Sequence, residues 1–139
     1  MNIEEIRRIF QNAPFISALG IDLVSAGDGE CATKLTIGSR HLQQDGFVHA
    51  GVQSTMADHT AGAAAGTLIG SGDIVLTAEF KINLLRPARG EALLCRARVI
   101  NPGRKLMVVE SEVYCLADST ETLVSKLLGT MAVVPLRDP

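Results

Sequence analysis

The sequence has little of what marks several common classes of protein. Thirteen Lys and Arg face fifteen Asp and Glu, giving a net charge of −2, so the basic surface of a nucleic-acid-binding protein is missing. No stretch approaches the roughly 18 uncharged apolar residues of a membrane span. The N-terminus, with Glu4 and Glu5 among its first residues, lacks the basic and apolar regions of a signal peptide. We therefore expect a cytoplasmic protein that binds neither nucleic acid nor a membrane.

Cysteine is also scarce. The three thiols are odd in number, lack C-x-x-C spacing and lie in apolar runs: Cys31, Cys95 and Cys115. This pattern predicts buried, reduced cysteines rather than metal ligands. His41 lies in a polar loop, and His59 directly follows Asp58 and so cannot share its helix face. We therefore expect no metal site.

The composition that is present is typical of a soluble globular domain. Hydrophobic residues make up 47% of the chain and charged residues 20%, close to average usage. A chain of 139 residues corresponds to about one domain and can bury a core without disulfides. No repeat or linker interrupts it, so we expect residues 1–139 to form a single domain.

Local patterns at the N-terminus predict a helix followed by a hairpin. Asn2 and Glu5 form a capping pair, and apolar residues then recur at helical spacing as far as Pro14. Residues 21–24 and 31–37 predict two short strands, joined by a turn that contains Gly and Asp at 25–29.

The second half predicts a run of antiparallel strands. Apolar and polar side chains alternate strictly over residues 76–84. The pattern places five apolar residues on one core-facing side: Leu76, Ala78, Phe80, Ile82 and Leu84. The next two strands, near 93–99 and 107–113, are joined by a turn at 101–103, and a last strand covers about 122–134. Across the middle pair, Arg96 and Arg98 are placed to pair with Glu110 and Glu112.

Residues 49–66 differ from these strands because they are rich in Ala and Gly. Alanine favours a helix, whereas each glycine costs about 1 kcal/mol there, so the glycines indicate that another element approaches the helix backbone closely. The expected architecture is an α+β fold in which a long antiparallel sheet wraps around one central helix.

The same helix carries the residues best suited to chemistry. Asp58 is its only carboxylate, and an unpaired carboxylate is costly to bury among alanines, so Asp58 should face a cleft or serve a function. His49 stands at the start of the helix, where a histidine either caps the helix, packs in the core or joins a site.

Several motifs together resemble one family. The segment Gln43–Gly51 (QQDGFVHAG), followed by Asp58 nine residues after His49, is similar to the pattern Asn-x-x-Gly-x-x-His-Gly-Gly with a downstream Asp. That pattern belongs to hotdog-fold acyl-CoA thioesterases of the phenylacetic acid degradation type, within the 4-hydroxybenzoyl-CoA thioesterase-like superfamily. Residues 80–90 (FKINLLRPARG) resemble the family's strand and Arg-Pro-Ala turn, and residues 101–104 (NPGR) resemble its following hairpin. The resemblance spans about residues 15–134 and implies a hotdog fold, an antiparallel β-sheet wrapped around a long central α-helix.

Two positions depart from the family pattern. Gln43 stands where the family usually has Asn, so the amide is kept but reaches one methylene further. Ala50 replaces the first Gly after the histidine. Because the family uses the backbone N–H of that residue, alanine still supplies the group.

The spacing suits thioester hydrolysis, in which negative charge develops on the carbonyl oxygen. The N–H groups of Ala50 and Gly51 at a helix N-terminus form a pre-oriented site for that charge. His49 would orient this turn or hydrogen-bond the thioester. Asp58 would act as a general base on water or attack as a nucleophile, and the sequence does not choose between the two.

The distance between these groups predicts a site shared by two chains. Nine residues of helix separate His49 from Asp58, about 13.5 Å of rise and about 180° of rotation. Two antiparallel helices related by a two-fold axis can bring both groups to one carbonyl, and the resemblance implies the same shared site in a homodimer, with a homotetramer built as a dimer of dimers. The resemblance also implies that Thr77 helps to position water. The alternation, however, places Thr77 on the face of Glu79 and Lys81, so this role requires a bulge that re-aims the side chain.

The coenzyme A part of such a substrate needs local cations, because the chain carries a net charge of −2. Arg86, Arg89 and Arg104 lie at strand ends and turns, and the resemblance places nucleotide contacts there, with Gly103 in the same hairpin. Each arginine taken singly fits a solvated loop position equally well. No separate cofactor is expected, since coenzyme A is part of the substrate.

We interpret the chain as an acyl-CoA thioesterase, and the sequence does not specify the acyl group of its substrate. Two alternatives remain. One is a non-catalytic acyl-CoA-binding or regulatory hotdog protein, which the departure at Gln43 keeps open. The other is a hotdog hydratase or dehydratase, for which we expect a helix Glu or an Asp/His dyad at another spacing, and neither is present.

Overall fold

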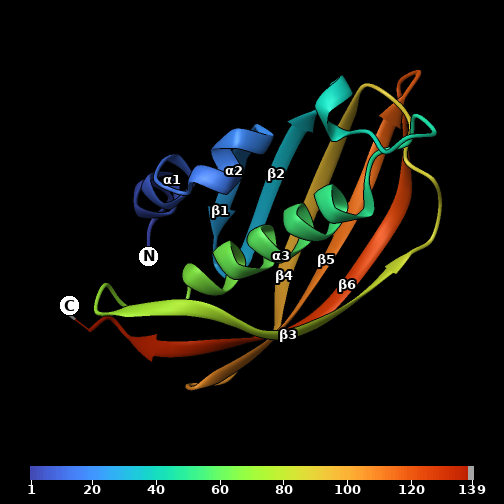
Figure 1. Ribbon diagram of the computed structural model, residues 1–139. Coiled ribbons are helices and arrows are strands. Elements are labelled where there is room, and N and C mark those ends of the chain that lie inside the picture. Colours follow the sequence, from blue (N-terminus) through green and yellow to red (C-terminus); the bar gives the residue numbers. More distant parts are fainter. Residues whose placement is uncertain (138–139) are drawn as a thin grey trace.

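The computed structural model describes residues 1–137 (Figure 1). Within this range lie three α-helices, α1 (Ile3–Gln11), α2 (Pro14–Leu19) and α3 (Ala50–Gly66), and a 3-10 turn at Ser39–His41. The strands of the same range are β1 (Ile21–Gly27), β2 (Glu30–Thr36), β3 (Asp73–Leu84), β4 (Ala92–Pro102), β5 (Leu106–Ala117) and β6 (Thr120–Pro135). They form one antiparallel sheet in the order β1-β2-β4-β5-β6-β3. The predicted hotdog architecture is confirmed.

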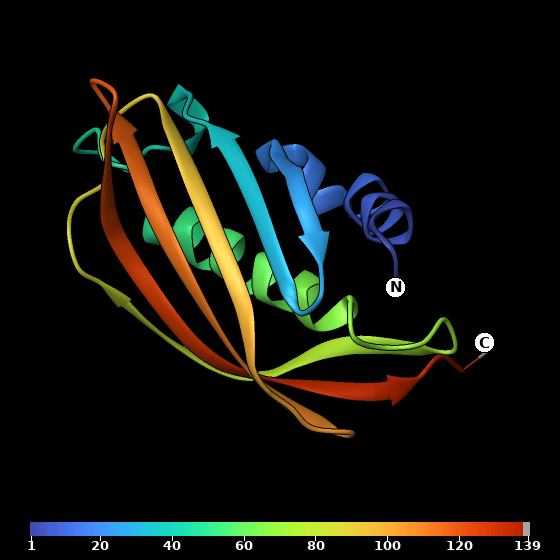
Figure 2. The same ribbon diagram turned by 180° about the vertical axis from the view of Figure 1, so that it is seen from behind.

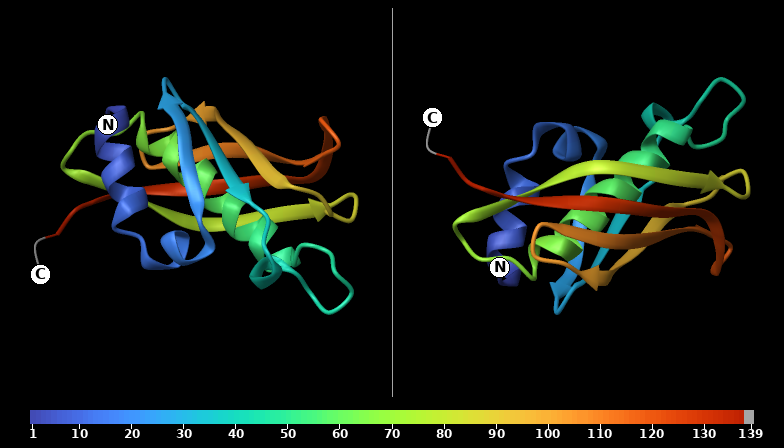
Figure 3. Two further views of the ribbon diagram at one scale, coloured as in Figure 1. Left: turned by 90° about the horizontal axis from the view of Figure 1, so that it is seen from above. Right: turned by 90° about the horizontal axis from the view of Figure 1, so that it is seen from below.

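The central helix α3 lies across the concave face of the curved sheet, and Figure 3 shows it crossing the strands. Its small residues allow this approach, because Ala57, Ala61 and Ala64 are fully buried. A buried hydroxyl ties the helix to the sheet where Ser111 Oγ donates a 2.7 Å hydrogen bond to the Ala57 carbonyl. The helix predicted over 49–66 is therefore confirmed, with His49 as its N-cap.

The thiols are free and buried, as predicted, at Cys31, Cys95 and Cys115. Burial raises the pKa of Cys31 and of Cys95 to about 12, so both stay protonated and unreactive. Among residues 1–137, no helix is long and apolar enough to cross a membrane.

The N-terminal segment contains one more helix than the sequence predicted. The capping box of Asn2 and Glu5 starts α1 as expected. Pro14, however, does not only end the first helix but starts α2, because proline is well suited to the first helical position. Gly20, in the left-handed conformation with φ of 74°, ends α2.

The β1–β2 hairpin is confirmed. β1 extends three residues further than predicted, to Gly27, and β2 begins and ends one residue earlier than predicted. Asp28 and Gly29 both have positive φ, 51° and 79°, which is the conformation of a two-residue type I′ turn. The β4–β5 turn lies two residues later than predicted, because β4 continues through Pro102 past a bulge near Ile100. A Cβ at Gly103 would overlap the Leu106 carbonyl oxygen, so this turn requires glycine.

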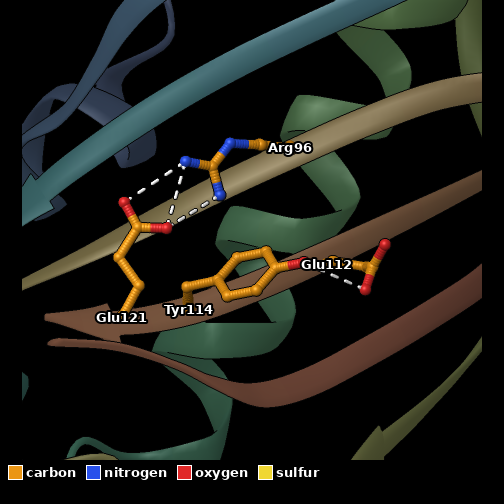
Figure 4. Close-up of polar contacts among 4 residues, drawn as sticks. All are labelled: Arg96, Glu112, Tyr114 and Glu121. Atoms are coloured by element: carbon orange, nitrogen blue, oxygen red, sulfur yellow. Dashed lines mark hydrogen bonds and ion pairs between the residues drawn. The ribbon is translucent and has the colours of Figure 1, made fainter.

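Figure 2 shows the convex face of the sheet from behind. Charged side chains of β4, β5 and β6 form ion pairs across these strands. Arg98 pairs with Glu110 as expected. Arg96 does not pair with Glu112, although the two lie opposite each other in the register. It instead forms 3.2 Å hydrogen bonds to Glu121 across the face, while Glu112 accepts a hydrogen bond from the Tyr114 hydroxyl (Figure 4).

The strict alternation predicted for residues 76–84 is wrong in part. The register of β3 against β6 shifts between Thr77 and Glu79, so Ala78 forms a bulge, and the face turned toward α3 changes parity there. Leu76, predicted to be in the core, is 52% exposed. Beyond the bulge, Phe80 and Leu84 remain 39% and 49% exposed, because β3 is the edge strand and this chain provides no neighbour on its outer side within residues 1–137.

Candidate active site

The bulge in β3 places Thr77 against the carboxylate of α3. Thr77 Oγ1 donates a 2.8 Å hydrogen bond to Asp58 Oδ1. Ala78 is the extra residue of the bulge. It reverses the side-chain alternation at Thr77, so the proposed role of Thr77 no longer conflicts with the strand pattern. Since the hydroxyl occupies one carboxylate oxygen, Oδ2 of Asp58 is left for another partner.

The surroundings of Asp58 make its carboxylate more basic than usual. Burial raises its pKa above the ordinary value, and the hydrogen bond from Thr77 partly offsets this by lowering it. His59 beside it is held neutral, because burial lowers its pKa from 6.5 to about 4, and its ring packs edge-on against Phe10, with centroids 4.5 Å apart. Asp58 therefore lacks a cationic partner in His59 and retains a basic carboxylate, the form that a general base requires.

A cavity of about 310 Å³ opens beside Asp58, between α1, α3 and β3. Its walls are mostly apolar and include Ile6, Ile9, Ala63, Ile74 and Val75. Thr77 and Asp58 are also among its lining residues, so a group seated in the cavity can contact the carboxylate. The residues described here that line it include no Lys or Arg.

The other candidate groups lie at the N-terminus of α3. His49 Nδ1 accepts a 2.8 Å hydrogen bond from the Gly51 N–H, which leaves Nε2 as the protonated nitrogen of a neutral ring. The Gly51 N–H is thus already engaged. Ala50 stands at the first helical position, where the backbone N–H has no acceptor within the helix, and the residue is exposed, as an oxyanion site requires.

Gln43 shapes the loop that precedes this helix. Its side-chain oxygen accepts hydrogen bonds from the Asp45 and Phe47 N–H groups, the second at 3.3 Å. Its backbone N–H donates to the Phe47 carbonyl at 2.8 Å. Gly46, with φ of 86°, allows the chain to turn between these contacts. The longer side chain at position 43 therefore organises its own loop next to the start of α3.

His41 is a supporting residue that the sequence did not indicate. It was expected in a polar loop, yet it is only 2% exposed. Its Nε2 lies 2.7 Å from the Leu19 carbonyl, and its Nδ1 accepts a hydrogen bond from Gly38. Its own carbonyl accepts a 2.8 Å hydrogen bond from the His49 N–H. His41 thus joins α2 to the start of α3, and nothing in its sequence neighbourhood signals that burial.

One chain does not bring the two groups of site residues together. Ala50 and Asp58 are eight residues apart on one straight helix, about 12 Å. The arginines are divided as well. Arg86 and Arg89 precede β4, whereas Arg104 and Gly103 follow it, about 35 Å away along an 11-residue strand.

The arginines before β4 also have contacts of their own. Arg86 Nη1 donates a 2.9 Å hydrogen bond to the Leu123 carbonyl. The Arg89 guanidinium lies over the Phe47 ring, 6.0 Å from its centroid. Within residues 1–137, no cluster of three His, Cys, Asp or Glu side chains is arranged to hold a metal ion.

This sheet, its enclosed helix and the carboxylate on that helix define a hotdog-fold protein with a candidate hydrolytic site. A sequence model described as the thioesterase superfamily matches residues 45–122. The chain belongs to the thioesterase superfamily.

Individual relatives agree with this assignment. A solved thioesterase family protein from Silicibacter pomeroyi is 33% identical, with 95% of this chain and 97% of that chain covered and a TM-score of 0.93. A 1,4-dihydroxy-2-naphthoyl-CoA hydrolase from Listeria monocytogenes is 29% identical over 83% of this chain and 91% of its own. The E. coli PaaI protein from the phenylacetic acid degradation operon shares the fold, with a TM-score of 0.83 at 21% identity, covering 94% of this chain and 91% of its own.

Proposed function

We propose that this protein hydrolyses acyl-CoA thioesters to a free acid and coenzyme A. The observation that carries the proposal is the Asp58 carboxylate, which accepts a 2.8 Å hydrogen bond from Thr77 through one oxygen and belongs to a residue that lines an apolar cavity. The superfamily and its hydrolase relative support the same chemistry.

Hydrolysis then uses each group in turn. Asp58 Oδ2 accepts a proton from a water molecule, whose oxygen forms a bond to the thioester carbon. The carbonyl electrons move to oxygen, and the Ala50 N–H stabilises the resulting negative charge. When the carbonyl re-forms, the carbon–sulfur bond breaks and coenzyme A leaves as a thiolate, which takes up a proton. His49, through its contact with Gly51, orients the turn that carries the oxyanion donor.

The cavity beside Asp58 supports an apolar, uncharged acyl group. A cavity of about 150 Å³ is enough for benzene, so about 310 Å³ suits an arylacyl group, as in the phenylacetic acid degradation type, or a medium-length alkyl chain. A second carboxylate on the acyl group would meet Asp58 and Asp73 in the same cavity, and like charges at short range repel. Dicarboxylic acyl groups should therefore be poor substrates.

The complete site requires a second copy of the chain. The separation of Ala50 and Asp58 along α3 supports a pair of antiparallel helices, in which Asp58 of each chain meets the Ala50 turn of the other. The edge strand β3 supports this arrangement because Leu76, Phe80 and Leu84 leave apolar surface exposed beside its unpaired edge. A second copy would also bring Arg86 and Arg89 of one chain toward Arg104 of the other, as phosphate binding requires.

The test is a panel of acyl-CoA esters assayed with a thiol reagent, using the wild-type protein and Asp58→Asn. Arylacyl and medium-chain esters should be hydrolysed, and the variant should lose at least about 100-fold in kcat, the usual contribution of a general base. Asp22→Asn, on the exposed surface of β1, is the matched control and should retain activity. Undiminished hydrolysis by Asp58→Asn would contradict the assignment.

A further inference from the structure

A buried amide near the start of α3 has no partner for its oxygen. Gln53 is only 3% exposed, and no group within residues 1–137 donates a hydrogen bond to its Oε1 atom. Burying a polar atom without a partner is costly, and an apolar side chain of the same shape would avoid that cost. A ligand that supplies the missing hydrogen bond would explain why an amide occupies this position.

Gln53 is one of the residues that line a second cavity, separate from the one beside Asp58. This cavity has a volume of about 410 Å³, and its lining includes both Gln53 and Ala50, the residue that carries the proposed oxyanion donor. Most of its other walls are apolar, formed by Phe47, Val48, Leu84, Leu85 and Pro87. Arg86 lines it as well, so a cation is available to the part of a ligand that extends out of the cavity.

This geometry limits the chemistry of the ligand. Apolar walls disfavour a charged donor, because a charge would lose its hydration there. A neutral, slender chain that carries amide groups fits these walls, and the leaving group of an acyl-CoA ester contains such a chain between its sulfur atom and its phosphates. A thioester carbonyl held at Ala50 directs that chain into the cavity and its phosphates toward Arg86.

We propose that Gln53 binds a secondary amide of the pantetheine arm of coenzyme A, accepting a hydrogen bond from the amide N–H through Oε1. The inference rests on the proposed function, since it takes the thioester carbonyl to lie at the Ala50 N–H. Rotating the Gln53 amide by 180° exchanges its oxygen and nitrogen. In the rotated orientation the Gln53 NH₂ group donates a hydrogen bond to the carbonyl oxygen of the secondary amide. The ligand amide can therefore pair with Gln53 in either orientation.

The experiment compares wild type with Gln53→Met, which removes the amide but keeps an unbranched side chain of similar size. Three thioesters of the same acyl group are used: the coenzyme A ester, the pantetheine ester without nucleotide phosphates, and the S-ethyl ester without amides. The variant should raise KM for the first two about tenfold, the usual loss when a buried hydrogen-bonding group is left unpaired, and should change KM for the S-ethyl ester much less. Gln11→Met, at the exposed end of α1, is the matched control.

Two further measurements separate this inference from a structural role and from the proposed reaction. Without ligand, Gln53→Met should unfold at the same Tm as wild type or higher, because it removes an unpartnered buried amide. Calorimetric binding of coenzyme A itself does not depend on hydrolysis, so about tenfold weaker binding by the variant supports the inference even if no ester is cleaved. Equal losses with all three esters, a lowered Tm without ligand, or unchanged binding of coenzyme A would overturn it. Failure of wild type to bind coenzyme A would overturn it as well.

Discussion

Thr77 and Asp58, on different elements and 19 residues apart in the sequence, are joined by a 2.8 Å hydrogen bond from the hydroxyl to the carboxylate. The bond links the edge strand to the central helix at the point where the β3 bulge changes the direction of the side chains. It stabilises the charged form of Asp58, whereas burial of the same group acts in the opposite direction.

Removing that hydroxyl should shift the pH dependence of hydrolysis. In Thr77→Val the carboxylate keeps its burial but loses the hydrogen bond that lowers its pKa, so its pKa should rise further. The acid limb of the kcat/KM profile should therefore move to higher pH, because the ionised base forms later in the titration. Thr77→Ser keeps the hydroxyl and should retain the wild-type profile. Superimposable profiles for wild type and Thr77→Val would show that Thr77 does not act on the base.

The sequence predicted this contact only through the resemblance. The alternation over residues 76–84 predicted the correct side of the strand for Phe80 and Ile82 but the wrong side for Leu76. The extra residue at Ala78 exchanges the two sides of the strand for the residues that precede it. A bulge is determined by pairing with a distant strand, here β6, and has no local marker in this segment. Local alternation was correct on β4 and β5, where Leu93, Cys95 and Met107 are buried.

The site was predictable where a local pattern or motif defines it, and not where tertiary contacts do. His49 as the helix start and Asp58 as the helix carboxylate follow from the motif and its spacing. The burial of His41 and of Gln53 depends on how α2 and the loop before β4 fold over α3. His41 lies in no apolar run. Gln53 shares the helix face of the buried Ala57 and Ala61, but its polar side chain gave no sign of burial.

His59 should make the stability of the protein depend on pH below neutrality. Its pKa is about 4 in the folded protein against 6.5 in the unfolded chain. Between these values the unfolded chain binds the proton and the folded protein does not, so stability falls as pH decreases from 6.5 toward 4. At ~1.4 kcal/mol per pKa unit, the whole interval would correspond to about 3 kcal/mol. Because the His59 side chain is not fully buried, we expect a smaller contribution, about 2 kcal/mol.

Urea unfolding of wild type and His59→Gln at pH 7 and pH 4.5 measures this effect. The variant should lose less stability than wild type over that interval, because glutamine does not titrate. Lys34→Gln, at an exposed position on β2, is the control and should follow wild type. Parallel losses in wild type and His59→Gln would mean that other groups account for the acid sensitivity.

Gly62 should limit the size of the acyl group. It lines the cavity beside Asp58, and a Cβ added there would meet no atom within 4 Å, so a larger side chain can enter the empty volume. Gly62→Val should lower kcat/KM for an arylacyl or octanoyl ester at least about tenfold, and for an acetyl ester much less, since each misfitted methylene costs about 1–3 kcal/mol. Gly27→Val, in open space on β1, is the matched control. Equal losses for short and long acyl groups would place the acyl group elsewhere.

Mixing two inactive variants should restore activity if each site uses residues of two chains. Ala50→Pro removes only the proposed oxyanion N–H, because proline is favoured at the first helical position and His49 already has the extended conformation, φ −59° and ψ 139°, that proline requires of its neighbour. Asp58→Asn removes the base. In a mixed dimer, one site combines both defects and the other combines wild-type Asp58 with wild-type Ala50.

Random exchange of equal amounts makes about half of the dimers mixed, each with one intact site, so the mixture should reach about a quarter of wild-type kcat while either variant alone stays inactive. Differently tagged chains purified through both tags verify the exchange. The double variant Ala50→Pro/Asp58→Asn, mixed with wild type, is the control: its mixed dimers contain no intact site, so activity should fall below that of undisturbed wild-type dimers. Confirmed exchange between the single variants without recovery would show that Ala50 and Asp58 act within one chain, contrary to the rise of α3.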